Sequence, residues 1–312
     1  MDLATEVICT LTGVVCIVIA LRDGFEVLFH GGSRIALSRL IMRGSWMLFH
    51  RLARRRPRTF SFAGPVTLLA ILVSWGVLLV LGWALVIWPQ LPDGFRFASE
   101  LGTPTGQRDF VDALYISLVT LGTIGYGDIS PESDVLRLLV PLEAVVGFGL
   151  LTAAISWLLS VYPALSRRRS LAYEVTLLGD ALTTDASFLA REPDAVERIY
   201  AELLSRLVAV ERDLLTIPIA YYFGEHDDRF SLPVVMPWLL ALADEGLEET
   251  APPAVRLRAR MLRAAIDDFA RTTAARFHGC ESGSTRRLLE CYARDHLRAP
   301  RGAARMRALT AA

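Results

Sequence analysis

The strongest constraint on the fold of this chain is a run of 23 residues without a charged side chain, VTLLAILVSWGVLLVLGWALVIW, at 66–88. A helix of that length, rising about 1.5 Å per residue, is long enough to cross the hydrocarbon core of a bilayer. A second apolar run, at about 136–162, is longer than a perpendicular crossing requires, so we expect it to tilt. With 53% apolar residues and no net charge over 312 residues, the composition also favours a membrane protein.

We expect the first apolar run, at 5–21, to be a retained transmembrane helix rather than a signal peptide. The residues around its start include Asp2 and Glu6 instead of basic side chains, and no small-residue cleavage site follows it. About 17 residues is the lower limit for crossing a bilayer, so a segment that lies on the membrane surface is the alternative.

The positions of the arginines predict how these helices are oriented. The chain has no lysine, so arginine carries the basic charge, and this composition favours a GC-rich, bacterial coding sequence. Arginines are dense between the first and second apolar runs and again at 167–169, whereas the loop at 89–119 contains only Arg96 and Arg108. Because the cytoplasmic flanks of membrane helices are enriched in basic residues, we expect the N-terminus and this loop to lie outside a plasma (cell inner) membrane and the C-terminal half to lie in the cytosol.

Two further regions show helical patterns. The stretch at 33–56 alternates apolar residues with arginines so that the two fall on different sides of a helix, which predicts a helix along the inner membrane surface; a solvated linker is the alternative. From about 170 onward no run is long enough to cross a membrane, and strand-like alternation is scarce. There we expect an all-helical domain with amphipathic helices at 170–184, 193–215, 233–246, 253–276 and 284–298.

A short polar stretch lies between the second and third apolar runs. The segment DFVDALYISLVTLG at 109–122 is helical in pattern but too short to cross, and TIGYGD at 123–128 follows it. In lipid every backbone polar group has to be satisfied, so an irregular Gly-Tyr-Gly stretch at membrane depth must be buried in protein or line a water-filled path. We therefore expect this stretch to face a pore.

The residues TLGTIGYGD at 120–128 resemble the selectivity-filter signature of tetrameric potassium channels, T-x-x-T-V-G-Y-G-D, with Ile124 in place of valine. The resemblance covers 66–162 and does not extend to the C-terminal half. It implies that backbone carbonyls replace the water shell of a potassium ion, that the Thr123 hydroxyl contributes, and that the side chains of Ile124 and Tyr126 pack outward against the pore helix. The implied ion-binding residues are Thr123, Ile124, Gly125, Tyr126 and Gly127. One such loop per chain supplies a quarter of each ring of oxygens, which implies a homotetramer.

Asp128 ends the signature at the outer mouth, and Thr120 begins it. In similar channels this acid bonds an aromatic residue of the neighbouring pore helix, and Tyr115 is the candidate partner here. The alternative is an exposed acid that only raises the local concentration of cations. We therefore assign Thr120, Tyr115 and Asp128 to support of the filter and its outer mouth.

The third apolar run contains one acid in its membrane body, Glu143, and two central glycines, Gly147 and Gly149. An ionisable group in a membrane helix normally faces protein or water, so Glu143 is interpreted as a support contact behind the filter, with a cavity-lining site for cations and an interfacial position as alternatives. Similar channels bend near the two glycines when they open. Glycine also serves close packing in membrane helices, so a hinge and a packing role both stay open.

Several other classes of site lack the residues they need. The sequence shows no arginine-every-third-residue voltage sensor, no Rossmann-type glycine motif, no cyclic-nucleotide cassette, and no nucleophile-plus-base arrangement of an enzyme. His278, Cys280, Cys291 and His296 match no strong zinc spacing, so we interpret them as buried thiols and helix-end histidines, and neither cysteine pair suggests a disulfide framework. The acidic stretch GEHDDRF at 224–230 does not fit a calcium loop and favours a solvated turn.

Together these features predict an all-α membrane protein: a two-helix potassium-channel pore with a re-entrant pore loop, an extra N-terminal transmembrane helix and a helical cytosolic C-terminal domain. The expected regions are an N-terminal transmembrane helix at 1–22, a cytoplasmic amphipathic or interfacial segment at 23–65, the pore domain at 66–162 and the cytosolic helical domain at 163–312. We expect a potassium-selective channel subunit that is no enzyme, with K⁺ as permeant ion, no other metal or cofactor, and no nucleic-acid partner. The alternative is a non-conducting, membrane-anchored helical sensor or scaffold with a vestigial pore loop.

Overall fold

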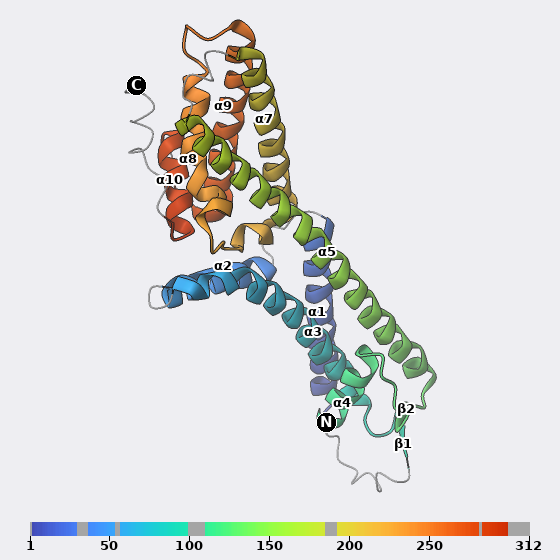
Figure 1. The fold of residues 1–312 in the computed structure, drawn as a ribbon. Coiled ribbons are helices and arrows are strands. Elements are labelled where there is room, and N and C mark those ends of the chain that lie inside the picture. The colour runs from blue at the N-terminus through green and yellow to red at the C-terminus, as the bar shows by residue number, and fades with distance from the viewer. Residues whose placement is uncertain are drawn as a thin grey trace. The chain divides into compact units, whose positions relative to one another are not determined.

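The computed structural model describes residues 2–29, 37–53, 57–98, 110–184, 192–280 and 283–298, and nearly all of its elements are helices (Figure 1). Three of the helical segments are long and apolar enough to cross a membrane: Leu3–Leu28, Thr59–Gln90 and Asp134–Thr184. The expected fold class, an all-α membrane protein, is therefore confirmed.

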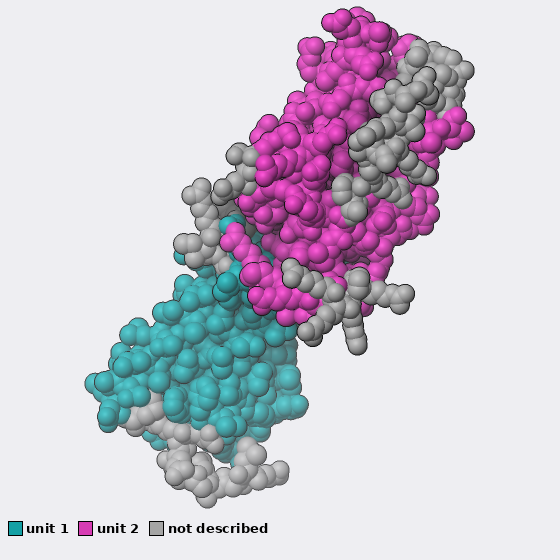
Figure 2. Space-filling model, turned by 90° about the vertical axis from the view of Figure 1, so that its left-hand side faces the viewer, with its two compact units in different colours: residues 1–42, 68–160 teal, residues 43–67, 161–312 magenta. Residues whose placement is uncertain are grey.

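The chain packs as two compact units (Figure 2). The first combines residues 1–42 with 68–160, and the second combines 43–67 with 161–312. Three helices contribute residues to both units, namely α2 (Leu37–Ala53), α3 (Ala63–Ile87) and α5 (Asp134–Thr184).

In the first unit, the N-terminal helix α1 (Leu3–Phe29) packs closely against α3. A Cβ atom on Gly13 would lie 2.4 Å from the carbonyl oxygen of Gly82, and one on Gly82 would lie 2.9 Å from that of Gly13. Small residues of this kind let the backbones of membrane helices approach each other. The helix runs beyond the apolar run at 5–21, because the polar groups of its last turns have partners.

The clearest of those partners surround Asp23, which is buried near the end of α1. Its carboxylate accepts hydrogen bonds from the backbone N–H of Ser38 at 3.1 Å and from the indole N–H of Trp75 at 2.7 Å. The Trp75 ring lies 5.9 Å from that of Trp157 on α5. One acid therefore links α1, α2 and α3, and the tryptophan pair extends the link to α5.

A short helix and a two-stranded sheet complete the first unit. Helix α4 (Phe110–Leu121) confirms the expected helix at 109–122, although residue 109 lies outside the described residues. Strand β1 (Phe95–Phe97) pairs antiparallel with β2 (Ile129–Pro131), so that Arg96 faces Ser130. The sequence did not predict these strands, because three residues are too few to show an alternating pattern. The core between α3, α4 and the sheet consists of Ala84, Ile87, Leu91, Phe95, Ala113, Ile116 and Leu136.

Helix α5 differs from the expectation of two helices at 136–162 and 170–184, because it is one helix of 51 residues. The segment at 163–170 contains one proline, Pro163, and no glycine, and most of its other residues are good helix formers. The arginines at 167–169 also find partners within the second unit, as described below. The helix therefore continues through this segment, although Pro163 removes one of its backbone hydrogen bonds.

The second unit is a bundle built from α7 (Pro193–Thr216), α8 (Leu232–Glu245), α9 (Pro253–Thr273) and α10 (Thr285–Asp295), with the end of α5. These helices lie within a few residues of the expected ranges. Buried side chains recur at helical spacing on α7 and α9, including Leu203, Leu207, Leu262 and Ile266. Proline at the first position of α7 and of α9 fits the start of a helix.

The cysteines of the second unit are not the buried thiols expected from the sequence. Cys280 and Cys291 form a disulfide, with their Cα atoms 6.5 Å apart. The chain turns at Gly279, which has a left-handed φ of 59°, between the π-helical turn η6 (Ala274–His278) and α10. This turn brings the two cysteines together. No group of three or more metal-ligating side chains occurs among the residues that the structure describes.

Candidate functional site

The signature stretch at 122–128 follows directly from the end of α4. The backbone N–H of Thr123 donates to the carbonyl of Thr120 at 2.9 Å, and the N–H of Ile124 donates to the carbonyl of Val119 at 2.9 Å. These bonds satisfy carbonyls of the last helical turn, which have no partner inside the helix itself. The stretch is therefore anchored to the C-terminus of α4.

The backbone of this stretch alternates in handedness. The φ angle is positive at Thr123 (56°), Gly125 (60°) and Gly127 (78°), whereas Ile124 and Tyr126 do not have positive φ. In an ordinary strand successive peptide groups point to opposite sides. An alternation in the sign of φ counteracts that reversal and can bring successive carbonyls to one side. Glycine adopts positive φ without the cost, about 1–2 kcal/mol, that a side chain imposes.

The stretch is uncovered in the single chain. The side chains of Ile124 and Tyr126 are 56% and 69% exposed, and a Cβ atom on Gly125 or Gly127 would meet nothing within 4 Å. The expectation that the side chains of Ile124 and Tyr126 pack outward against the pore helix concerns an assembly of several copies, so it stays a prediction. Helix α4 of the same chain contacts the stretch at Thr123 and Ile124 but leaves the side chain of Tyr126 largely exposed.

Asp128 is fixed at the end of the stretch. The Tyr115 hydroxyl donates to its Oδ2 at 2.5 Å, and the backbone N–H of Ile129 donates to its Oδ1 at 3.1 Å. The carbonyl of Asp128 accepts from the N–H of Ala98 at 2.8 Å. The expected contact between Asp128 and Tyr115 is thus present, and it joins α4 to the sheet.

A salt bridge connects β1 to the residue that follows β2. Arg96 Nη2 lies 2.6 Å from Glu132 Oε1, and both side chains are exposed. The hydrogen bond and the charge of Arg96 lower the pKa of Glu132 below its ordinary value.

Glu143 on α5 is 0% exposed and contacts α4. The Ser117 hydroxyl, which is also fully buried, donates to its Oε1 at 2.6 Å, and Oε2 has no hydrogen-bond partner among the described residues. Complete burial fits the interpretation as a contact between helices and does not fit an interfacial position. Sequence reasoning missed Ser117, although a hydroxyl on the inner face of an apolar helix was the available signal.

The two central glycines of α5 have different surroundings. A Cβ atom on Gly147 would lie 2.1 Å from the carbonyl oxygen of Leu121, whereas one on Gly149 would have open space. Gly147 is therefore needed for the close approach of α5 to the end of α4. Helix α5 is continuous through both positions, so the hinge role stays a prediction.

The segment that contains the signature stretch matches a known protein family. Residues 68–162 match the family model described as "Ion channel". The match covers less than a third of the chain, so the similarity to the ion channel family is that of the segment 68–162. Its members are transport proteins rather than enzymes.

Individual relatives agree with the family match. "Two-pore potassium channel 2" of Arabidopsis thaliana is 50% identical over 46 residues, which is 15% of this chain and 10% of that protein. "Two-pore potassium channel 3" of the same plant is 46% identical over 50 residues, 16% and 12% of the two chains. The resemblance of the ion-channel segment to potassium channels is therefore confirmed.

A longer match extends over more of the chain. "Uncharacterized membrane protein YdjJ" of Bacillus subtilis (strain 168) is 27% identical over 143 residues, 46% of this chain and 40% of that protein. The chain thus matches two fifths or less of the length of these curated relatives. No solved structure matches it.

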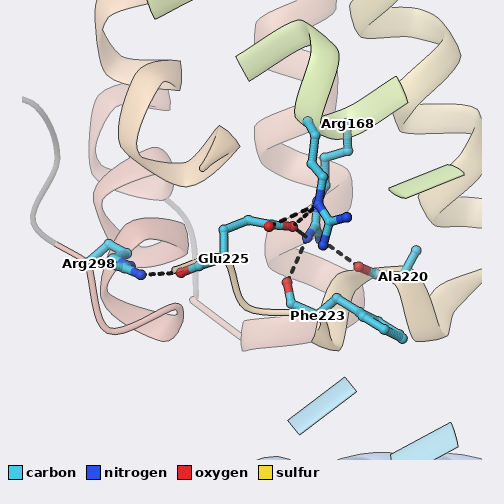
Figure 3. Close-up of polar contacts among 6 residues, drawn as sticks. Arg168, Ala220, Phe223, Glu225 and Arg298 are labelled. Carbon is cyan, nitrogen blue, oxygen red and sulfur yellow. Dashed lines mark hydrogen bonds and ion pairs between the residues drawn. The ribbon is translucent and has the colours of Figure 1, made fainter. Parts of the chain in front are cut away.

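Three consecutive arginines follow the ion-channel segment along α5, and all three are anchored within the second unit. Arg167 makes two hydrogen bonds to Asp213, at 2.6 and 2.9 Å, and Arg169 Nε lies 2.9 Å from both carboxylate oxygens of Glu225. Arg168 is buried, and Figure 3 shows its guanidinium group between Glu225 and the carbonyls of Ala220 and Phe223. The sequence indicated only a basic flank of a membrane helix at this position.

The loop at 224–230 is a solvated turn only in part, because His226, Asp228 and Arg229 are exposed whereas Gly224 is buried. Glu225 binds two of the arginines, its carbonyl accepts from Arg298, and Asp228 pairs with Arg298 at 2.8 Å. A Cβ atom on Gly224 would lie 2.7 Å from the ring of Phe60. Glu225 and Asp228 serve the packing of the second unit, and their partners are more than 50 residues away in the sequence.

Proposed function

We propose that four copies of this chain form a potassium-selective channel in which the stretch at 122–128 is the selectivity filter. The observation that carries the proposal is the alternating sign of φ from Thr123 to Gly127 in a stretch that one chain leaves uncovered. Rings of carbonyl oxygens around an axis would replace the hydration shell of K⁺. Neighbouring copies would then supply the cover that Ile124 and Tyr126 lack.

The end of α4 adds an electrostatic argument. The C-terminus of a helix carries a partial negative charge, and α4 ends at Leu121, next to the first ion-binding residue, Thr123. This partial charge favours a cation beside the stretch. Potassium is the permeant ion in this account, and conduction requires no cofactor.

The arginine distribution supports the orientation, with the N-terminus outside, the second unit in the cytosol and the protein in a bacterial inner membrane. Helix α2 would then lie at the inner membrane surface. Leu40, Met47 and Leu48 are exposed on it beside the exposed Arg43, as in helices that bind lipid headgroups, although Trp46 is buried in the second unit.

The test is ion flux from liposomes that contain the full-length chain. We expect potassium to exchange much faster than sodium, and we expect Gly125→Ala to abolish potassium flux, because a side chain at φ 60° strains the stretch. Gly76→Ala is the matched control: this glycine lies in α3, and a Cβ atom there would meet nothing within 4 Å. Equal potassium and sodium fluxes, or normal flux through Gly125→Ala, would overturn the proposal.

Native mass spectrometry of the same preparation tests the assembly. A mass of four chains is expected. A tetramer without flux would favour the non-conducting scaffold, and a stable monomer would remove the basis of the proposal, since one chain supplies only one side of an ion path.

A further inference from the structure

A helix from the N-terminal part of the chain is docked in the second unit around one buried histidine. His296, at the end of α10, is 4% exposed, and its Nε2 has no hydrogen-bond partner among the described residues. Its ring centroid lies 5.3 Å from that of Trp46 on α2, 4.8 Å from Tyr221 and 5.0 Å from Tyr292. The histidine thus forms part of the surface against which α2 packs.

Asp295 holds the same docking in place. Its carboxylate accepts a hydrogen bond from the indole of Trp46 at 3.2 Å and one from the Tyr221 hydroxyl at 2.5 Å. Trp46 is itself buried and lies 4.8 Å from the ring of Phe60, just before α3. The segment 43–53 of α2 is therefore attached to the second unit through one tryptophan, one acid and a set of aromatic rings.

The groups around His296 oppose a positive charge on it. Burial in the aromatic surroundings lowers its pKa well below the ordinary value, and nearby positive or ionisable nitrogens lower it further: Arg168 on α5, His50 on α2, His278 in η6 and Arg298 after α10. His278, whose two ring nitrogens are also buried without a hydrogen-bond partner among the described residues, has a lowered pKa for the same main reason. Two acids lie nearby: Asp295, which raises the pKa of His278 against the effect of burial, and Glu225, which is paired with Arg168.

We propose that the docking of 43–53 on the second unit is a pH-sensitive latch, which opens when protonation of His296, assisted by His278, introduces charge into the aromatic contact. The neutral rings fit the docked state, so docking is strongest above about pH 6.5, where His296 is neutral in both the docked and the released state. Below that pH the released state binds protons more readily than the docked state. The ratio of released to docked chains then rises by up to about tenfold per pH unit for each histidine involved.

One histidine acts in the opposite direction. His50 Nε2 lies 3.9 Å from Asp295 Oδ1, so a charge on His50 favours docking. That pair is partly exposed and its separation is long, so solvent weakens it, whereas His296 is enclosed. The buried histidines therefore determine the sign of the pH effect.

Hydrogen–deuterium exchange of the full-length chain in lipid nanodiscs tests the latch directly and does not depend on ion conduction. Backbone exchange of 43–53, divided by its chemical rate, is expected to be at least about tenfold faster at pH 5.5 than at pH 7.5. Exchange in the core of α9, at 259–269, serves as the internal reference and should stay unchanged.

Variants assign the effect to the histidine. His296→Phe keeps an aromatic ring but cannot take up a proton, so most of the acid response should disappear; His296→Gln provides a second, smaller replacement. His226→Gln is the matched control, because this histidine is exposed in the loop at 224–230, and it should behave as wild type. Equal relative exchange of 43–53 at both pH values in wild type, or a full acid response in His296→Phe with α9 protected, would overturn the proposal.

Discussion

Glu143 places an acid inside an apolar helix, where an unpaired polar group is costly. Its one described partner is the Ser117 hydroxyl, at 2.6 Å. The bond joins the helix that leads into the signature stretch to the helix that follows it. A single residue pair thereby influences the position of both.

This pair yields a prediction at the residue scale. Ser117→Ala leaves Glu143 buried without its donor, so we expect a loss of about 1–3 kcal/mol in stability, measured as a lower midpoint of thermal unfolding in detergent. The double variant Ser117→Ala with Glu143→Leu removes both polar groups and should recover much of that loss. A midpoint of Ser117→Ala equal to that of wild type would show that the bond contributes nothing.

The residue types of the candidate site could be predicted from the sequence because backbone geometry dictates them. Positive φ at Gly125 and Gly127 requires glycine, and those glycines are visible in the sequence. The positive φ of Thr123 could not be foreseen, since threonine normally avoids that region. The exposure of Ile124 and Tyr126 in the single chain has no local signal in the sequence either.

At the scale of elements, the contact between α4 and α5 depends on one glycine. A Cβ atom on Gly147 would lie 2.1 Å from a backbone oxygen that cannot easily move, while Gly149, two residues later, has open space. Substitutions at Gly147 and Gly149 therefore test a packing role and a hinge role independently within one helix.

We expect Gly147→Ala to lower the unfolding midpoint and the potassium flux, and Gly149→Ala to leave the midpoint close to that of wild type. The flux of Gly149→Ala reports on bending: unchanged flux indicates that flexibility at this position is not needed. If Gly147→Ala were as stable as wild type, the close approach of α4 to α5 would be contradicted.

Most element positions followed from hydrophobic periodicity, but two features did not. The break expected between 162 and 170 is absent, because the change from apolar to charged residues marks a change of surroundings and not the end of the helix. The anchoring of Asp23 by Ser38 and Trp75 involves partners 15 and 52 residues away. Contacts at that separation have no local pattern from which they could be predicted.

At the scale of the whole molecule, the ion-channel segment and the second unit share the continuous helix α5. The arginines at 167–169 attach the end of this helix to the second unit by charge-assisted hydrogen bonds, which are stronger than neutral ones. The second unit also holds 43–53, from the N-terminal part of the chain.

The central claim concerns ion selectivity, and the reversal potential across a planar bilayer tests it most directly. Full-length protein is placed in a bilayer with a tenfold gradient of potassium in one direction and a tenfold gradient of sodium in the other. The account predicts a current that reverses within a few millivolts of the potassium equilibrium potential, about 59 mV in magnitude. A reversal potential near zero, or the absence of current from a tetrameric preparation, would contradict it.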